Sequence, residues 1–179
     1  MPCCSAVLTF IERALATTVA EAVDRALLNG SGAAGQPIGI LNVPGIDSRA
    51  GTSFALADAA AMLKVADGWD ASGSVRWVAG VDAAEDLRTR LKSANGGETL
   101  MADNDTMLGK PVLVSRSVGA QVLAVMPWGQ LWMATWGAME IGVDTFTHFT
   151  TGKIVVRCLW NIDFAPERAQ SIAVATALT

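Results

Sequence analysis

Residues 26–41 read Ala26-Leu27-Leu28-Asn29-Gly30-Ser31-Gly32-Ala33-Ala34-Gly35-Gln36-Pro37-Ile38-Gly39-Ile40-Leu41, and they join a predicted helix to the rest of the chain. The helix is predicted from about Ser5 to Leu28, because apolar side chains recur there at helical spacing: Leu8, Ile11, Leu15, Val19, Val23, Ala26 and Leu27. The 3.6-residue period indicates an amphipathic helix, and about 24 residues make a rod roughly 36 Å long. Asn29 and Gly30 are expected to end it, because both tolerate the left-handed conformation that closes helices.

The glycines after this helix admit two interpretations. Residues 30–35 match G-x-G-x-x-G, the dinucleotide-binding pattern, which requires a strand before the glycines and a helix that opens from them. Here the predicted helix comes first and Gln36-Pro37 follows at once, which favours an extended chain. A tight turn whose glycines supply positive φ is therefore favoured, and a nucleotide-binding enzyme that uses the turn from Gly30 to Gly35 stays a minor alternative.

Composition narrows the class of protein. The chain has 179 residues, a net charge of −4 and only 17% charged residues, against about 25% in an average protein. Lysines and arginines are scattered singly, so a direct nucleic-acid site is not expected. No apolar run approaches the ~18 residues of a membrane-spanning helix. The low charge and the six tryptophans indicate surface that is covered by other subunits, and an alanine-rich monomer is the alternative.

The three cysteines give neither a disulfide framework nor metal-ligand spacing. Cys3 and Cys4 are adjacent and the total is odd, so a reducing compartment is the default. Cys158 lies in a strand-like run and is expected to be a small buried side chain.

The remaining elements follow from periodicity and turn residues. A second helix is predicted at 54–66 with Thr52 or Ser53 as its cap, and a third at 83–93 opened by a capping box from Asp82. Strands are predicted at 75–79, 111–115, 121–126, 138–144, 153–164 and 171–175. Trp128, Trp132 and Trp136 are four residues apart, and the flanking strands favour a buried aromatic stripe over a ligand-stacking platform.

No constellation in the sequence calls for catalysis. His148 is the only histidine, and neither a nucleophile elbow nor a phosphate-binding loop accompanies it. Asp103-Asn104-Asp105 resembles a calcium loop only superficially, since the glycine and the downstream acid are missing. We therefore expect no catalytic, cofactor or metal site and no enzyme activity.

Three segments together resemble one protein family. Residues 26–41 are similar to the signature that follows the spine helix in tailed-bacteriophage major capsid proteins of the Hong Kong 97 type. The segment from Leu108 to Ser115 and the C-terminal region resemble two further landmarks of that family, although Trp128 and Gln130 depart from its pattern. The residues that carry the resemblance are Asn29, Gly30, Gly32, Gly35, Pro37, Gly39, Leu108, Gly109, Pro111, Ser115, Asp163 and Pro166.

The resemblance implies an α+β protein with the capsid fold of that type. A long spine helix and antiparallel strands would form a peripheral domain, residues 1–46 and 135–179, with a mixed α/β axial domain inserted at 47–134. The implied function is that of a structural subunit, which self-associates into pentamers and hexamers of an icosahedral phage or prophage capsid. The implied location is the virion, after assembly in the bacterial host cytoplasm, with portal, scaffold or protease proteins as further partners and no membrane contact. An encapsulin-like compartment shell subunit, which shares the fold, is the alternative.

Two expectations concern the start of the chain. Family members carry an N-terminal arm and an extended loop before the spine helix, and here the predicted helix begins almost at Met1. We therefore expect an N-terminally truncated major capsid protein that forms no closed shells by itself. The Leu15→Asp variant is expected to unfold, because it would place an unpaired carboxylate in the middle of the apolar stripe.

Overall fold

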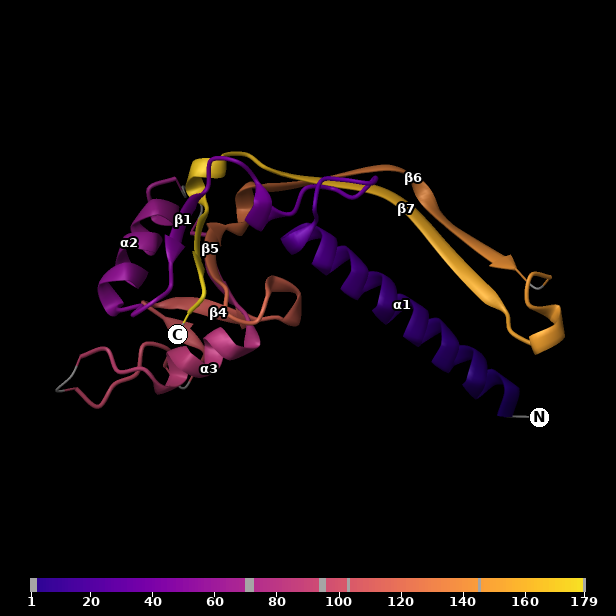
Figure 1. Ribbon diagram of the computed structural model, residues 1–179, viewed down its shortest axis with the longest axis horizontal. Coiled ribbons are helices and arrows are strands. Elements are labelled where there is room, and N and C mark those ends of the chain that lie inside the picture. The colour runs from indigo at the N-terminus through magenta and orange to yellow at the C-terminus, as the bar shows by residue number, and fades with distance from the viewer. Residues whose placement is uncertain (1–2, 70–72, 94–95, 103, 145, 179) are drawn as a thin grey trace.

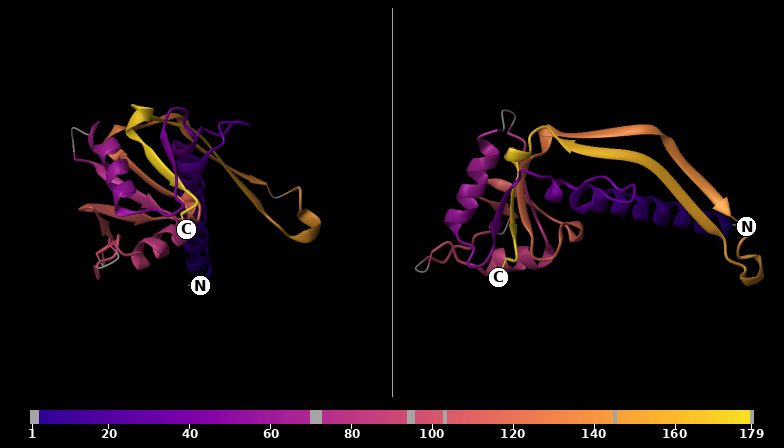
Figure 2. Two further views of the ribbon diagram at one scale, coloured as in Figure 1. Left: turned by 60° about the vertical axis from the view of Figure 1, so that its left-hand side comes forward. Right: turned by 45° about the horizontal axis from the view of Figure 1, so that its top comes forward.

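Two differently built parts make up the molecule (Figure 1). The computed structural model describes residues 3–69, 73–93, 96–102, 104–144 and 146–178, with the backbone alone for residues 3–11 and 149. One part is layered around a six-stranded sheet, and the other is elongated and contains one long helix and one long β-hairpin. Figure 2 shows that the helix and the hairpin extend from the sheet toward the same side.

The six-stranded sheet has the order β1-β8-β5-β2-β4-β3. Its strands are β1 (Asp47–Ala50), β2 (Val75–Ala79), β3 (Thr106–Met107), β4 (Lys110–Val114), β5 (Leu123–Pro127) and β8 (Ala173–Thr176). The pairs β1–β8 and β2–β4 are parallel, and the other pairs are antiparallel. The sheet is therefore mixed, as the sequence predicted for the inserted lobe.

The core of the molecule lies on the two faces of this sheet. The main cluster packs α2 (Leu56–Asp67) and α3 (Val81–Thr89) against the sheet around Trp77, whose Nε1 donates a hydrogen bond to the Met107 carbonyl at 3.2 Å. A second cluster, centred on Ile40 and Met126, covers alternate residues of β5 and β8. Both faces of the central strands are covered, which explains why β5 is apolar throughout rather than alternating.

The elongated part contains α1 (Cys3–Asn29) and the two-stranded antiparallel sheet of β6 (Leu131–Asp144) and β7 (Val155–Pro166). The 27 residues of α1 correspond to about 40 Å of helix. The predicted helix is thus confirmed, with ends within two residues of the expected ones. Leu28, near the end of α1, is buried, whereas Leu15, Val19 and Val23 are only half-buried.

Short 3₁₀ turns connect these elements. They are η1 (Ile40–Asn42), η2 (Arg116–Val118), η3 (Trp128–Gln130), η4 (Phe149–Thr151) and η5 (Ala169–Ser171). The three tryptophans were predicted to lie on strands, but the first of them, Trp128, lies in the turn η3. The strand β6 begins immediately after it, at Leu131.

Both predicted helix caps are wrong in detail. The helix α2 begins at Leu56, and Asp58 in its first turn accepts a hydrogen bond from the Ala55 backbone N–H at 2.9 Å, so neither Thr52 nor Ser53 is its N-cap. The helix α3 begins at Val81 after Gly80, which places Asp82 inside its first turn. An acidic residue in a first turn is stabilised by the helix dipole without being a cap, and this explains the misleading pattern.

The pairing of the last strand, β8, does not fit the predicted division of the chain into two lobes. Residues 135–179 were grouped with α1, but β8 forms hydrogen bonds with β1 and β5 in the larger sheet. After β7 the chain therefore returns to the layered part. The division into two lobes stays a prediction, with β8 counted in the sheet.

Candidate assembly surface

A joint between α1 and the larger sheet gathers several of the predicted signature residues. Asn29, the last residue of α1, donates a side-chain hydrogen bond to the Ser117 carbonyl in η2. Ser115 accepts a hydrogen bond from the Ser117 N–H at 3.2 Å and so caps η2. Asn42 donates to the Gly30 carbonyl at 3.0 Å. The first two signature segments, which lie far apart in sequence, therefore meet where the helix joins the sheet.

The glycines of the joint are required for two different reasons. Gly32 and Gly35 have φ of +68° and +78°, which favour glycine, as predicted. Gly30 and Gly39 do not have positive φ, but their backbones are in close contact, since the Gly39 N–H donates to the Gly30 carbonyl at 2.8 Å. A Cβ on Gly30 would lie 2.2 Å from the Pro37 oxygen, and a Cβ on Gly39 would lie 2.3 Å from the Gly30 nitrogen.

The nucleotide alternative finds no support in this geometry. The loop from Gly30 to Gly39 folds back on itself through a bridge between Ser31 and Ile38. A 3₁₀ turn of three residues, η1, is the first helical segment after it. The helix N-terminus that a pyrophosphate requires is therefore not formed at this turn.

The other signature residues lie away from the joint. Leu108 and Gly109 form the two-residue turn between β3 and β4 with φ of +51° and +75°, and Pro111 follows in β4. Positive φ at both central positions is the type I′ hairpin geometry. Asp163 and Pro166 lie on β7, at the base of the hairpin. The structure thus places the signature residues at three turns and strand ends, not in one site.

The β6–β7 hairpin carries apolar side chains on both of its faces. Trp132 and Trp136 are 67% and 59% exposed, and they share one face because they are four residues apart on one strand. The prediction that these tryptophans are core is therefore wrong for this single chain. The opposite face of the hairpin carries Cys158 and Trp160 of β7, and both side chains are partly exposed. The expectation of a fully buried Cys158 is wrong as well.

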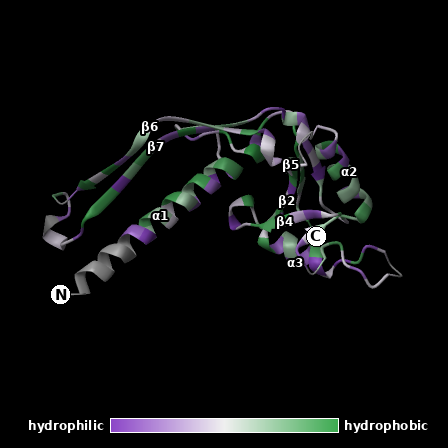
Figure 3. Cartoon of the chain, turned by 180° about the vertical axis from the view of Figure 1, so that it is seen from behind, coloured by the Kyte–Doolittle hydropathy of each residue, from purple (hydrophilic) through white to green (hydrophobic). Residues whose placement is uncertain are grey.

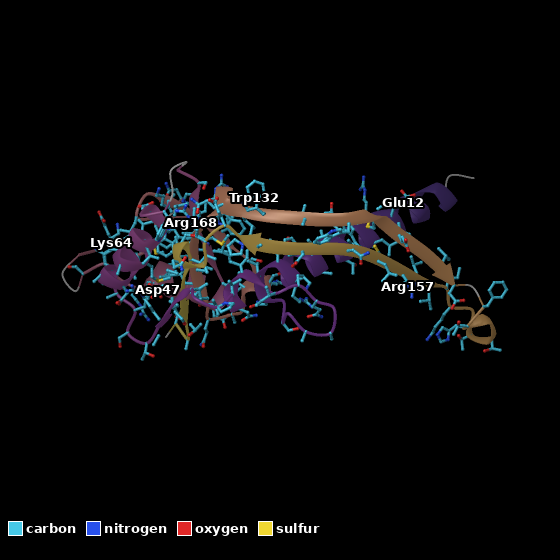
Figure 4. The ribbon with its side chains drawn as sticks, turned by 90° about the horizontal axis from the view of Figure 1, so that it is seen from above. Glu12, Asp47, Lys64, Trp132, Arg157 and Arg168 are labelled. Atoms are coloured by element: carbon cyan, nitrogen blue, oxygen red, sulfur yellow. The ribbon has the colours of Figure 1, made fainter. Side chains whose placement is uncertain are left out.

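A groove runs between that second face and α1. It has a volume of about 610 Å³. The helix contributes Leu15, Val19 and Val23 to its walls together with the carboxylates of Glu12 and Asp24, and the hairpin contributes Met139, Ile141, Val156, Cys158 and Trp160. Figure 3 shows hydrophobic segments along both walls, and Figure 4 shows Glu12 on α1 and Arg157 on the half of β7 that leads to the tip. The apolar stripe predicted for the helix thus faces an open groove.

The tip of the hairpin, residues 144 and 146–154, exposes two further large apolar side chains. Phe146 is 86% exposed and Ile154 is 66% exposed. Asp144 holds the turn, because its carboxylate accepts hydrogen bonds from the Thr147 hydroxyl and from the backbone N–H groups of Phe146 and Thr147. These bonds hold the pKa of Asp144 below its ordinary value. Phe146 was not predicted as a functional residue, because residues 145–151 are otherwise mostly polar and rich in threonine.

The described residues offer no other candidate site for chemistry. They contain no group of three or more His, Cys, Asp or Glu side chains placed to hold a metal ion. Asp103 lies outside the described residues, while its neighbour Asp105 forms an exposed ion pair with Arg88 at 2.9 Å. His148 is exposed at the hairpin tip. No helix in the described part of the chain is long and apolar enough to cross a membrane.

The chain is similar to known proteins in three respects: its match to a family model, its sequence identity to a curated protein and its fold. The model of the phage capsid family matches residues 5–177. The major capsid protein of Halomonas phage phiHAP-1 is 23% identical over 167 residues, which are 92% of this chain and 28% of that protein. The chain therefore spans little more than a quarter of this curated relative.

Solved structures share the fold at low identity. The capsid of an empty GTA particle superposes with a TM-score of 0.67 at 18% identity, over 95% of this chain and 66% of that one. A structure of Gordonia phage Cozz gives 0.66 at 14% identity, over 96% and 63%. The virus-like particle from Pyrococcus furiosus gives 0.54 at 13% identity, over 76% and 57%. Because the family model covers nearly all of the sequence, the chain belongs to the phage capsid family.

Proposed function

We propose that this chain is a structural subunit of an icosahedral phage or prophage capsid. One observation carries the proposal: α1 and the β6–β7 hairpin expose many large apolar side chains, including those that line the groove between them, which the chain itself does not cover. Soluble monomers rarely expose contiguous apolar patches beyond a few hundred Å², and larger ones are typical of interaction sites. Copies of the same chain are the natural cover, since the similar solved structures include capsids and a virus-like particle.

The architecture suits the Hong Kong 97 type of subunit. In this proposal α1 is the spine helix and forms the peripheral lobe with β6 and β7, while the six-stranded sheet with α2 and α3 is the axial lobe. In this proposal the joint fixes the angle between the lobes, because the Asn29 side chain at the end of α1 donates a hydrogen bond to the Ser117 carbonyl in η2 and the Gly39 N–H holds the loop to Gly30. A fixed angle matters for a shell, since a small error in each subunit accumulates around a ring.

The proposal assigns binding and no catalysis to the chain. Self-association into pentamers and hexamers is the proposed interaction, with the virion as the final location and the bacterial host cytoplasm as the place of assembly. Portal, scaffold or protease proteins would be the further partners. A specific nucleic-acid site is not part of the proposal, because the net charge is −4 and the cations are dispersed.

The mass of the purified chain tests this function. Light scattering coupled to gel filtration, repeated over a range of protein concentrations, should show a mass that rises above 18.7 kDa as concentration increases. Electron microscopy of the largest species should show rings or shell fragments. The Trp132→Ser variant removes exposed apolar area and should shift the rise to higher concentration, whereas Thr147→Ser at the hairpin tip keeps the apolar area and should not. A chain that stays monomeric at every concentration would refute the proposal.

A further inference from the structure

We propose that the hairpin tip of one copy inserts into the groove between α1 and the hairpin of a second copy. Phe146 and Ile154 of the tip would lie against the apolar walls of that groove. The inference rests on the proposed function, because it requires that copies of this chain associate. It goes further by naming the two surfaces that meet.

The groove has the properties of an incomplete core. Among the described side chains of α1, none before Leu28 is buried, so the stripe of Leu15, Val19 and Val23 has no adequate cover. A two-stranded sheet is also marginal unless it packs against another layer. An apolar insert would bury both walls at once, and the hydrophobic gain is about 25 cal/mol for each Å² removed from water.

The tip has the properties of an insert. Phe146 is more exposed than any other large apolar side chain in the described part of the chain, and Ile154 belongs to the same tip. The bonds from Phe146 and Thr147 to Asp144 at 2.8 and 3.1 Å fix the turn that presents Phe146. A turn that is already ordered loses less conformational freedom on binding, which favours association.

The charges of the two surfaces are complementary. The groove is flanked by the carboxylates of Glu12 and Asp24, which lie about 18 Å apart along α1. The tip carries Lys153 and the Asp144 carboxylate, which is hydrogen-bonded within the tip, and the strand that leaves it carries Arg157, about 13 Å from Lys153 along an extended chain. None of these five residues forms an ion pair with another described residue of its own chain. Opposite charges at the rim would orient the tip as it enters.

The tip cannot fill the groove of its own chain. Cys158 of the groove pairs with Ile141, and Phe146 is five residues further along, about 16 Å for an extended chain. A tip that lies in this groove therefore belongs to a second copy. Tip and groove are different surfaces, so the contact is heterologous: each copy offers both, and repetition gives a closed ring or an open array.

Disulfide trapping tests the contact in the full chain. In a background with Cys3→Ser and Cys4→Ser, the Phe146→Cys variant has thiols only at the tip and at Cys158 in the groove. Mild oxidation should give a ladder of covalent dimers, trimers and larger species, because every copy has one tip and one groove. A short bismaleimide linker should give the same ladder without the strict distance of a disulfide.

Two matched controls make the result specific. Adding Cys158→Ser should abolish the ladder, whereas tip-to-tip contact would still give covalent dimers and would overturn the inference. Thr52 is exposed on the layered part. In the same Cys3→Ser and Cys4→Ser background, the Thr52→Cys variant should give no ladder. The Phe146→Ser variant should weaken association at least tenfold, while Thr147→Ser should change it less than twofold.

The failure of this inference differs from the failure of the proposed function. If the chain associates but the Phe146→Cys variant gives no ladder with either reagent, the tip does not enter the groove and the capsid function stands. If the chain remains a monomer at every concentration, both are overturned.

Discussion

The Gly30→Ala variant should lose a large part of the stability of the molecule. The added Cβ would lie 2.2 Å from the Pro37 oxygen and 2.5 Å from the Ala26 oxygen, so the two strands of the loop must separate by about 1.2 Å to reach an ordinary contact of 3.4 Å. That movement breaks three hydrogen bonds: Gly30 N–H to the Ala26 oxygen at 3.0 Å, Gly39 N–H to the Gly30 oxygen at 2.8 Å, and the Asn42 side chain to the Gly30 oxygen at 3.0 Å.

The magnitude follows from these contacts. Hydrogen bonds at about 0.5–1.5 kcal/mol each and overpacking at about 1–3 kcal/mol give a loss of roughly 3–7 kcal/mol. The total free energy of unfolding of a domain is about 5–15 kcal/mol. Urea unfolding at low protein concentration, followed by circular dichroism, measures the change through the midpoint, with the slope checked for constancy.

The matched control is Gly35→Ala in the same loop. Gly35 has φ of +78° and open space around its Cβ position, so only conformational strain of about 1–2 kcal/mol is expected. If Gly30→Ala is no more destabilising than Gly35→Ala, the close approach of the two strands does not hold the joint together.

Three further predictions concern the core, the groove and the tip. Leu87 lies on α3 and its side chain is fully buried in the core. The Leu87→Ala variant should lower the unfolding free energy by about 2–5 kcal/mol in urea titration. The expectation from the sequence that Leu15→Asp unfolds the chain is corrected by the structure, because Leu15 is only half-buried: this variant should cost less stability than Leu87→Ala in the same titration, but it should suppress association measured by light scattering. The pKa of Asp144 is lowered below its ordinary value of 3.8 by the Thr147 hydroxyl and the backbone N–H groups, so the stability that its bonds supply is present above that value and is lost as pH falls through the lowered pKa. An NMR titration of the Asp144 carboxyl should therefore give a midpoint below that of the Asp144 side chain in an unfolded peptide.

The sequence predicted the local elements well because their signals are local. The helical period located α1 to within two residues at each end, and the runs of β-branched residues located β2 and β7. The capsid resemblance, read from three short segments, is confirmed by the family match over residues 5–177. The caps of α2 and α3 were misjudged by two to three residues, since several polar residues near a helix start compete for the same backbone N–H groups.

The sequence could not predict which surfaces are covered. Periodicity shows that Leu15, Val19 and Val23 share one face of a helix, but it does not show which chain covers that face. The same limit applies to Trp132 and Trp136, which were predicted as core and are exposed. The pairing of β8 with β1 and β5 joins segments more than a hundred residues apart in one case, and no local pattern encodes such a partner.

The mispredictions of burial all fall on the elongated part, and this has a physical meaning. In the layered part, a residue predicted to be buried is buried by the same chain, as Trp77 and Leu87 show. In α1 and the hairpin the same apolar signals are present, but the covering layer is missing from the single chain. The sequence pattern of these residues is that of a buried surface, and the fold leaves them exposed, so the two agree when a further layer covers them. In the proposed function that layer comes from other copies, so the stability of the elongated part should depend on protein concentration in a way that the stability of the sheet does not.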